Sequence, residues 1–497
     1  MKVNRRICKS VEYAVVIAVF LILSVLFVLN TSNATSPVYP TYPIYELEKA
    51  DQATFTIMGK YWFVDGKLPY VDLFDHKGPV IFLLNGLGWS LTGNVYGISV
   101  IQSLFLFAYC MAAYAALKRR HTPLFAGLGV LFSLVMLRTV YAGGNTVEEF
   151  GLPFQMLGLM GLCEYARQDR AEHSLLWAFL YGISIAFFIL NRATDALCIC
   201  SGCVVVLVCL LRAKAYRNIL LNALVGLAGI VVTILPFVVY FAMHGALNAF
   251  WYGMIGYNIE YAGGNGSFWM IGMSIKEIIE VLIYCMPIFS AFAAGLALLV
   301  QRCFRRAALH IVLASVSLYY LFTSRFYDHY VITYVPLFVA ALSELDVCAL
   351  AKKGRRMRIL AALAAAVWML PSAALAIRME WNTRNDDKWH CVIEERPYDE
   401  LMRAIPQQEL GSTVLYNCVA SIYLKYDFCP VYTYFALQDW QGAESEKLMS
   451  RIEEEIASCE AKWVMTHGGT SKNVLSVLES SYTVVMTKDN YTLYHRL

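Results

Sequence analysis

Charged residues are scarce in this chain of 497 residues: they make up 15% of it, whereas 59% of the residues are hydrophobic. Soluble globular proteins have about 25% charged and roughly 45–50% apolar residues, so the composition excludes an ordinary cytosolic enzyme. A continuous basic stripe is also missing, which argues against nucleic acid as a partner. The sequence shows no internal repeat and no low-complexity tract.

Long apolar runs recur along most of the chain. Windows of roughly 20 apolar residues predict an α-helical polytopic membrane protein with about eleven transmembrane helices in the lipid bilayer. The windows lie near residues 11–30, 95–117, 122–140, 151–166, 174–190, 194–211, 218–241, 278–300, 307–323, 331–349 and 358–378.

Clusters of Lys and Arg fall at every second connection between these windows. By the positive-inside rule, this pattern predicts a multi-pass protein of the cytoplasmic membrane with a cytoplasmic N-terminus. An odd number of helices then places the C-terminal region outside the cytoplasm. A cleaved signal peptide is the alternative for the first window, but its apolar stretch of ~20 residues exceeds the usual 7–15 and favours an anchor.

The balance of charge changes near residue 379. Residues 1–379 contain 29 Lys and Arg against 19 Asp and Glu, whereas residues 380–497 contain 11 against 18. We therefore expect a membrane domain over 1–379, with a long first outer loop at 31–94, and a small extracytoplasmic α/β domain over 380–497. In that domain, hydrophobic patterning predicts strands at 413–417 and 462–466, a helix at 445–458 and a hairpin at 482–495.

Four of the 14 cysteines lie in the C-terminal region, namely Cys391, Cys418, Cys429 and Cys459. In an oxidising compartment they can form two disulfides, but the spacing fixes no pairing and leaves free thiols open. Cys198, Cys200 and Cys203 have a metal-like spacing without a nearby fourth ligand, and we assign no metal site there.

Residues 50–60 and 65–79 bring carboxylates, a histidine and lysines together among aromatics and glycines, directly after the first window. Asp72 and Asp75 are three positions apart, close enough to share one turn. An amphipathic interfacial helix with a solvated polar face, followed by a Pro/Gly turn, is the alternative interpretation.

Three motifs carry a resemblance to a known family. The segment Gly66–Pro79 resembles the first outer loop of bacterial GT-C glycosyltransferases, the multi-spanning enzymes related to protein O-mannosyltransferases (glycosyltransferase family 39) and aminoarabinose transferases. The segment Gly143–Pro153 resembles their second loop. Asp328–Tyr330, followed by Pro336, resembles the His-Tyr element before a late helix. The order of the motifs and the predicted topology agree with this family.

The resemblance implies an inverting glycosyltransferase. Such an enzyme moves a sugar from a polyprenyl-phosphate donor to a hydroxyl of a glycan, lipid or protein acceptor on the outer face of the membrane. It implies no certain cofactor, although a divalent cation is possible because carboxylates facing a phosphate can hold one. A lipid-linked glycan flippase or a secondary transporter is the alternative, but transporters tend to show repeated halves and ionisable residues near the bilayer midplane.

The family places its catalytic base at an acidic position opening a short helix in the first outer loop. Asp51 matches this position best. Many relatives have a paired Asp-Glu or Asp-Ser at this point, whereas this chain has Asp51 followed by Gln52. Glu48, Asp72 and Asp75 remain alternatives.

Other motif positions correspond to substrate contacts. Glu148 or Glu149 matches the family's second acidic site, and a helix-dipole role is the alternative. Lys77 and Arg192 are candidates for the donor phosphate, although an Arg192–Asp195 pair would also explain Arg192. The remaining candidates for binding phosphate or sugar are His76, Arg325, His329 and Tyr330.

Overall fold

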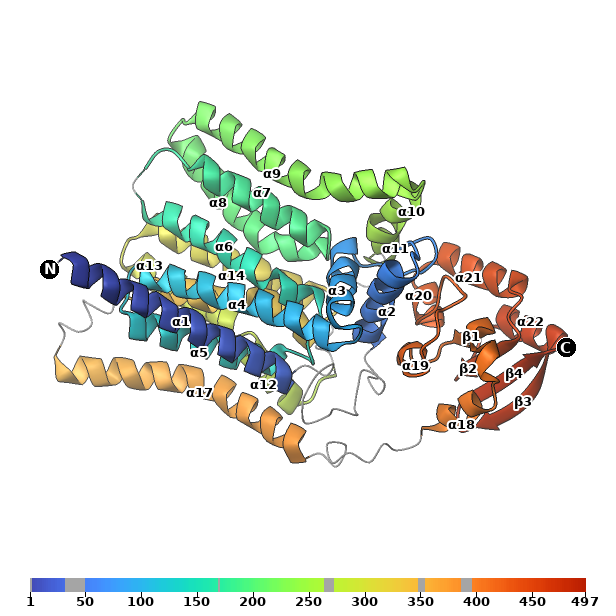
Figure 1. The fold of residues 1–497 in the computed structure, drawn as a ribbon. Coiled ribbons are helices and arrows are strands. Elements are labelled where there is room, and N and C mark those ends of the chain that lie inside the picture. Colours follow the sequence, from blue (N-terminus) through green and yellow to red (C-terminus); the bar gives the residue numbers. More distant parts are fainter. Residues whose placement is uncertain (1, 32–49, 169, 263–271, 347–353, 386–395) are drawn as a thin grey trace. The chain divides into compact units, whose positions relative to one another are not determined.

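The computed structural model describes residues 2–31, 50–168, 170–262, 272–346, 354–385 and 396–497 (Figure 1). The chain folds into two compact units, neither of them continuous in sequence. The first unit consists of Met1–Ser32, Val100–Pro236 and Gly266–Trp389; the second consists of Asn33–Ser99, Phe237–Asn265 and His390–Leu497. The expected boundary at residue 379 falls inside helix α17 (Arg355–Asn385), and that functional division stays a prediction.

Long apolar helices identify a multi-pass membrane protein. Within the described ranges, seven helices are long and apolar enough to cross a membrane, and a pair bent by 62° makes an eighth if it is one span. The seven are α1 (Lys2–Thr31), α4 (Tyr96–Lys118), α5 (Pro123–Val140), η2 with α8 (Ala193–Ala196 and Leu197–Arg212), α9 (Tyr216–Met243), α14 (Phe304–Thr323) and α17. The bent pair is α12 (Ile275–Tyr284) with α13 (Met286–Val300).

The three remaining hydropathy windows also coincide with helices. They are α6 (Val147–Arg167), α7 (Leu175–Ile189) and the consecutive η4 (Asp328–Tyr334) and α15 (Pro336–Leu342). Of these, α7 and η4–α15 are shorter apolar helices. Each of the eleven windows therefore holds a helix, while eleven as the number of spans stays a prediction.

The segment from residue 50 to residue 92 forms a helical hairpin in the second unit. Helix α2 (Ala50–Val64) packs against α3 (Pro79–Thr92) so closely that a Cβ on Gly59 would lie 2.4 Å from the backbone nitrogen of Gly86. Helix α3 begins with a proline, whose fixed φ suits the first helical position, and ends before Gly93 at φ 70°. Residues 52–61 of α2 are all buried, so this helix does not have the solvated polar face of an amphipathic interfacial helix.

Three short helical segments follow α9 in the second unit. They are α10 (Leu247–Trp251), one π-helical turn η3 (Tyr252–Gly256) and α11 (Tyr257–Ala262).

The C-terminal region is a mixed α/β fold, as expected. Its four-stranded sheet has the order β1-β2-β4-β3, in which β1 and β2 are parallel and the other pairs antiparallel. The strands are β1 (Thr413–Tyr416), β2 (Trp463–His467), β3 (Tyr482–Lys488) and β4 (Tyr491–Arg496). The helices are α18 (Pro397–Arg403), η6 (Gln407–Ser412), α19 (Ser421–Lys425), α20 (Gln438–Ala443), α21 (Glu446–Ser458) and α22 (Lys472–Ser481). The predicted strands, the helix at 445–458 and the closing hairpin are confirmed.

The hydrophobic core of the C-terminal region includes residues from elsewhere in the chain. Phe74, from the connection between α2 and α3, and Tyr257, from α11, are both buried in it. The ring of Phe74 lies 5.3 Å from that of Tyr434 and 5.9 Å from that of Tyr257, between centroids. The backbone N–H of Phe74 also donates to the carbonyl of Thr433 at 2.9 Å. The C-terminal region therefore folds directly onto the connection that carries the first motif.

Cys418, Cys429 and Cys459 are free thiols, so no disulfide joins any two of them. Cys391 lies outside the described residues.

Candidate active site

Asp51 stands in the first turn of α2, where the positive end of the helix dipole favours a carboxylate. It is half-buried, although the ten residues after it are buried. Among the described residues, its carboxylate has no hydrogen-bond or ion-pair partner, and its charge acts on the nearby His76 imidazole. An unengaged carboxylate can accept a proton from a bound hydroxyl. Glu48, its alternative, lies outside the described residues.

The connection between α2 and α3 carries the next candidates side by side. The buried Asp75 carboxylate accepts from the backbone N–H of Lys77 at 2.9 Å. The Lys77 ammonium lies 2.9 Å from Nε2 of the buried His76, and 5.8 Å from the centroid of Phe55, one turn after Asp51. Asp51, Asp75, His76 and Lys77 are therefore brought together in the second unit.

Burial sets the ionisation of this cluster. Burial raises the pKa of the Asp75 carboxyl, against the opposing effect of the Lys77 ammonium and backbone N–H. Burial and the Lys77 charge hold the pKa of His76 well below its usual range, and Asp51 opposes them. His76 is therefore neutral near pH 7. Because an ammonium can only donate, Nε2 accepts from Lys77, which assigns the imidazole proton to Nδ1.

Asp72 and Asp75 do not share a helical turn. Asp72 accepts from the backbone N–H of Leu68 at 2.6 Å and so closes a tight turn. Asp72 is half-buried, and its carboxylate accepts a backbone hydrogen bond within its own loop, whereas the Asp75 carboxylate accepts one from the backbone N–H of Lys77.

Two aromatic side chains that sequence reasoning missed surround His76. The Tyr257 ring lies 5.4 Å and the Trp440 ring 6.1 Å from the imidazole, between centroids. Asn258 donates to the carbonyl of His76 at 2.8 Å. These residues are more than 180 positions away in the sequence, and no local pattern marks them.

In the first unit, Glu149 is fully buried and engaged on both oxygens. It accepts from the Gln102 amide, the Tyr141 hydroxyl and the backbone N–H of Asn145. Residues 142–145 all have positive φ, between 51° and 90°, so Glu149 fixes a backbone that is unfavourable for Ala142 and Asn145. This geometry points to a structural role for Glu149.

Glu149→Gln is expected to lower the free energy of unfolding by about 1–3 kcal/mol, because an amide group would face donors and leave one of them unpaired. Thermal unfolding of purified protein in detergent measures this. Glu164→Gln is the matched control on the same helix: its pair with Arg119 is partly exposed and should be worth ~1 kcal/mol or less. Equal losses in the two variants would contradict the structural role.

Glu148 belongs to a different cluster in the first unit. Its Oε1 lies 2.7 Å from Nη1 of Arg192, whose Nε donates to Asp195 at 3.1 Å. The Arg192 guanidinium stacks 3.7 Å from the centroid of Tyr330. Oε2 of Glu148 and Oδ2 of Asp195 are buried without a hydrogen-bond partner among the described residues. The expected Arg192–Asp195 pair is present, and two carboxylates share one guanidinium.

The other candidates of the first unit follow α14. His329 lies beside Tyr330 and acts electrostatically on Asp195. Arg325 is half-buried in the connection between α14 and η4.

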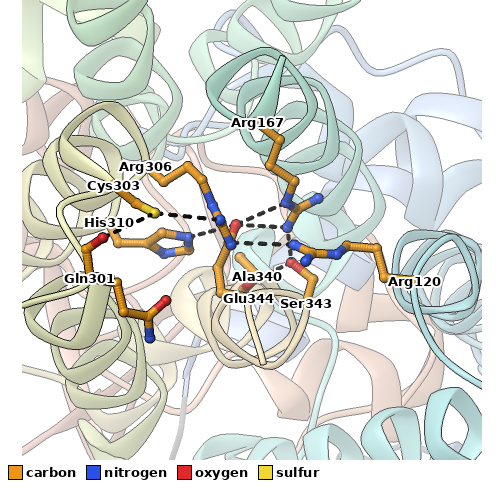
Figure 2. A network of polar contacts seen from close by, with 9 residues as sticks. All are labelled: Arg120, Arg167, Gln301, Cys303, Arg306, His310, Ala340, Ser343 and Glu344. Carbon is orange, nitrogen blue, oxygen red and sulfur yellow. Dashed lines mark hydrogen bonds and ion pairs between the residues drawn. The ribbon is translucent and has the colours of Figure 1, made fainter. Parts of the chain in front are cut away.

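One group of side chains has ligand atoms close enough to hold a metal ion: Cys163, His310 and Glu344, within 4.8 Å of one another in the described chain. Figure 2 shows why Glu344 does not fit that role. Both of its oxygens are engaged by guanidinium groups, from Arg167 on one and Arg306 on the other. These positive charges disfavour a divalent cation.

Solved structures of similar shape are known. ArnT from Cupriavidus metallidurans bound to undecaprenyl phosphate has a TM-score of 0.58 and 12% identity, and 98% of each chain is covered. The apo state of the same protein gives a TM-score of 0.57 at 11% identity, again over 98% of each chain. This chain therefore shares the fold of these ArnT structures.

The shared fold spans nearly the full chain, the C-terminal sheet included. An Archaeoglobus fulgidus oligosaccharyltransferase structure matches at a TM-score of 0.46 and 13% identity, covering 96% of this chain and 73% of that chain. No protein-family model matches the sequence, and no curated protein does.

Proposed function

We propose that this protein is an inverting membrane glycosyltransferase that moves a sugar from a polyprenyl-phosphate donor to an acceptor hydroxyl. The observation that carries the proposal is the agreement in fold, over 98% of both chains, with an ArnT structure that holds undecaprenyl phosphate, itself a polyprenyl phosphate. The motif at Gly66–Pro79 supports it independently, since its Asp75, His76 and Lys77 meet in one cluster with Asp51.

The proposed reaction needs a base and a place for the phosphate charge. The acceptor oxygen attacks the anomeric carbon, its proton passes to a carboxylate, and the bond from that carbon to the phosphate oxygen breaks. The polyprenyl phosphate leaves with the electron pair. Asp51 is the proposed base because its carboxylate is half-exposed and without a partner among the described residues. Asp75 and Asp72 remain alternatives, but each already accepts a backbone hydrogen bond.

Lys77 is the proposed donor-phosphate contact. Lys77 is half-buried, and its hydrogen-bond partner His76 is neutral. In the described chain no carboxylate forms a direct ion pair with the Lys77 ammonium, so its positive charge is available to a phosphate. Arg192 is the weaker candidate because Glu148 and Asp195 already offset its charge. We assign to Arg192 a positioning role, because it pairs with Glu148. We assign to Glu148, which keeps one oxygen unpaired among the described residues, the orientation of the acceptor.

The proposed setting is the outer face of the cytoplasmic membrane, with eleven spans, the N-terminus in the cytoplasm and the C-terminal region outside. Cysteine labelling from either side tests it. In a variant whose 14 native cysteines are replaced, Asp489→Cys, in the β3–β4 turn, should react with an impermeant reagent on intact spheroplasts.

Mass spectrometry of envelope glycans and lipids tests the function. We compare a deletion strain with one complemented by the wild-type gene. A sugar lost in the first and restored in the second identifies the product. Consumption of the lipid-linked sugar by purified protein is then measured with and without EDTA, and the comparison decides whether the reaction requires a divalent cation. A flippase or transporter would leave the sugar–phosphate bond intact.

Lys77→Ala is expected to lower kcat/KM for the lipid-linked donor by about tenfold to a hundredfold, because a charge-assisted contact contributes about 1.5–3 kcal/mol. The KM for the acceptor should change little. Initial rates at varied donor and acceptor concentrations measure both. Lys67→Ala, in the same loop, is the matched control, and Lys77→Arg should recover part of the loss. An unchanged donor dependence would count against Lys77.

A further inference from the structure

Helix α20 is fixed to the sheet by its first residue. The buried Gln438 amide donates to the carbonyls of Leu415 at 2.9 Å and Tyr434 at 2.6 Å, and its oxygen accepts from the backbone N–H of Asn417 at 2.8 Å. The polar atoms of this side chain are thus used to hold α20 at the end of β1.

The second residue of α20 adds further restraints. The Asp439 carboxylate accepts from the Tyr416 hydroxyl and from the Asn417 amide, and its backbone N–H donates back to Asn417 at 3.0 Å. Leu437, just before the helix, has φ 56°, a left-handed conformation that is uncommon for a bulky residue. Such strain persists only where the surroundings impose it, and it gathers at functional sites.

This anchoring presents Trp440 to the cluster proposed for catalysis. The Trp440 ring lies 6.1 Å from the His76 imidazole, which contacts the Lys77 ammonium and lies within the electrostatic reach of Asp51. Trp440 is half-buried, so part of this residue stays accessible to solvent. All of these residues belong to the second unit.

We infer that Trp440 binds a saccharide ring by stacking its indole on the ring's C–H face. This rests on the proposed function, which brings a sugar to the Asp51–Lys77 cluster. An indole offers a large rigid apolar face and an N–H, the combination that suits a ring with an apolar face and a polar rim. The saccharide is either the sugar being transferred or a sugar of the acceptor. The C-terminal region thereby becomes part of the substrate site.

A packing role against His76 is the competing explanation, and two substitutions separate the roles. Trp440→Phe keeps an aromatic face, whereas Trp440→Leu keeps apolar bulk without one. Stacking predicts that kcat/KM falls about tenfold or more for Leu but less than threefold for Phe, while thermal unfolding stays near wild type in both. Trp251→Ala, on α10 in the same unit and 37% exposed, is the tryptophan control.

The kinetic arms identify the source of the sugar. A raised KM for the lipid-linked donor assigns Trp440 to the transferred sugar, and a raised KM for the acceptor assigns it to the acceptor. Equal losses in Leu and Phe, or no loss in either, would overturn the inference.

A binding measurement keeps the inference separate from the proposed reaction. Protein labelled with fluorotryptophan gives a fluorine NMR signal for Trp440, assigned by its absence in Trp440→Phe. Methyl glycosides of glucose, galactose, mannose and N-acetylglucosamine are the probes. A saturable shift of this signal supports the saccharide site even if the deletion strain loses no glycan, in which case only the proposed function fails. A signal that no glycoside moves overturns the site.

Discussion

Asp51→Asn is expected to lower the rate of sugar transfer by about 10²–10⁴-fold, the range that a general base contributes. Asparagine has the shape of aspartate but cannot take the proton of the acceptor hydroxyl. The half-buried side chain has no partner among the described residues, so folding should be unaffected. Transfer by purified protein, at saturating donor and acceptor, measures the loss, and complementation of the deletion strain repeats it in cells.

Asp65→Asn and Asp75→Asn are the controls for Asp51. Asp65 is exposed in the same segment, and Asp75 keeps an acceptor for the Lys77 N–H when it becomes an asparagine. Both variants should retain most of the activity. Full activity in Asp51→Asn together with a large loss in Asp75→Asn would move the base to Asp75, whose raised pKa would then confine activity to higher pH.

The sequence predicted the elements because their signals are local. Hydropathy located a helix at each of the eleven windows, and hydrophobic patterning located all four strands of the C-terminal sheet. The motif at Gly66–Pro79 likewise indicated which loop carries charged chemistry.

The surroundings of that loop could not be predicted because they depend on contacts across the chain. Phe74 packs against Tyr434, and the hydrogen bond to Thr433 closes a gap of more than 350 positions. No pattern near Trp440 indicates that its ring faces His76. Such a contact forms only when two segments that are distant in the sequence pack together in the tertiary fold, and local sequence patterns do not predict that packing.

The adjacent Glu148 and Glu149 match the same motif position in the sequence, but their side chains have different partners in the structure. Glu148 and Glu149 both open α6, yet one pairs with Arg192 and the other holds a loop of positive-φ residues. Successive positions on a helix point about 100° apart, so the two carboxylates necessarily meet different neighbours. Only the positions of α4 and of the 190–195 segment decide which glutamate keeps an unpaired oxygen.

Glu344 is the centre of a charge cluster in the first unit, which Figure 2 shows in close view. Its carboxylate contacts Arg167 at 2.8 Å, Arg120 at 3.6 Å and also Arg306, and Nε2 of His310 lies 3.3 Å away. These residues come from the connection after α4, from the ends of α6 and α15, and from α14. A single buried anion therefore holds several helix ends together, although they would otherwise repel one another.

Glu344→Gln is accordingly expected to lower the free energy of unfolding by about 3–5 kcal/mol, because removing one partner of a buried ion pair leaves charge uncompensated. Thermal unfolding in detergent measures the effect. Glu280→Gln is the control, since its pair with Arg378 is more exposed and should be worth ~1 kcal/mol or less. If repulsion among guanidinium groups is the cause, adding Arg306→Met to Glu344→Gln should restore part of the loss, a non-additivity that a simple packing defect does not produce. A second substitution that only adds its own loss would contradict the electrostatic role.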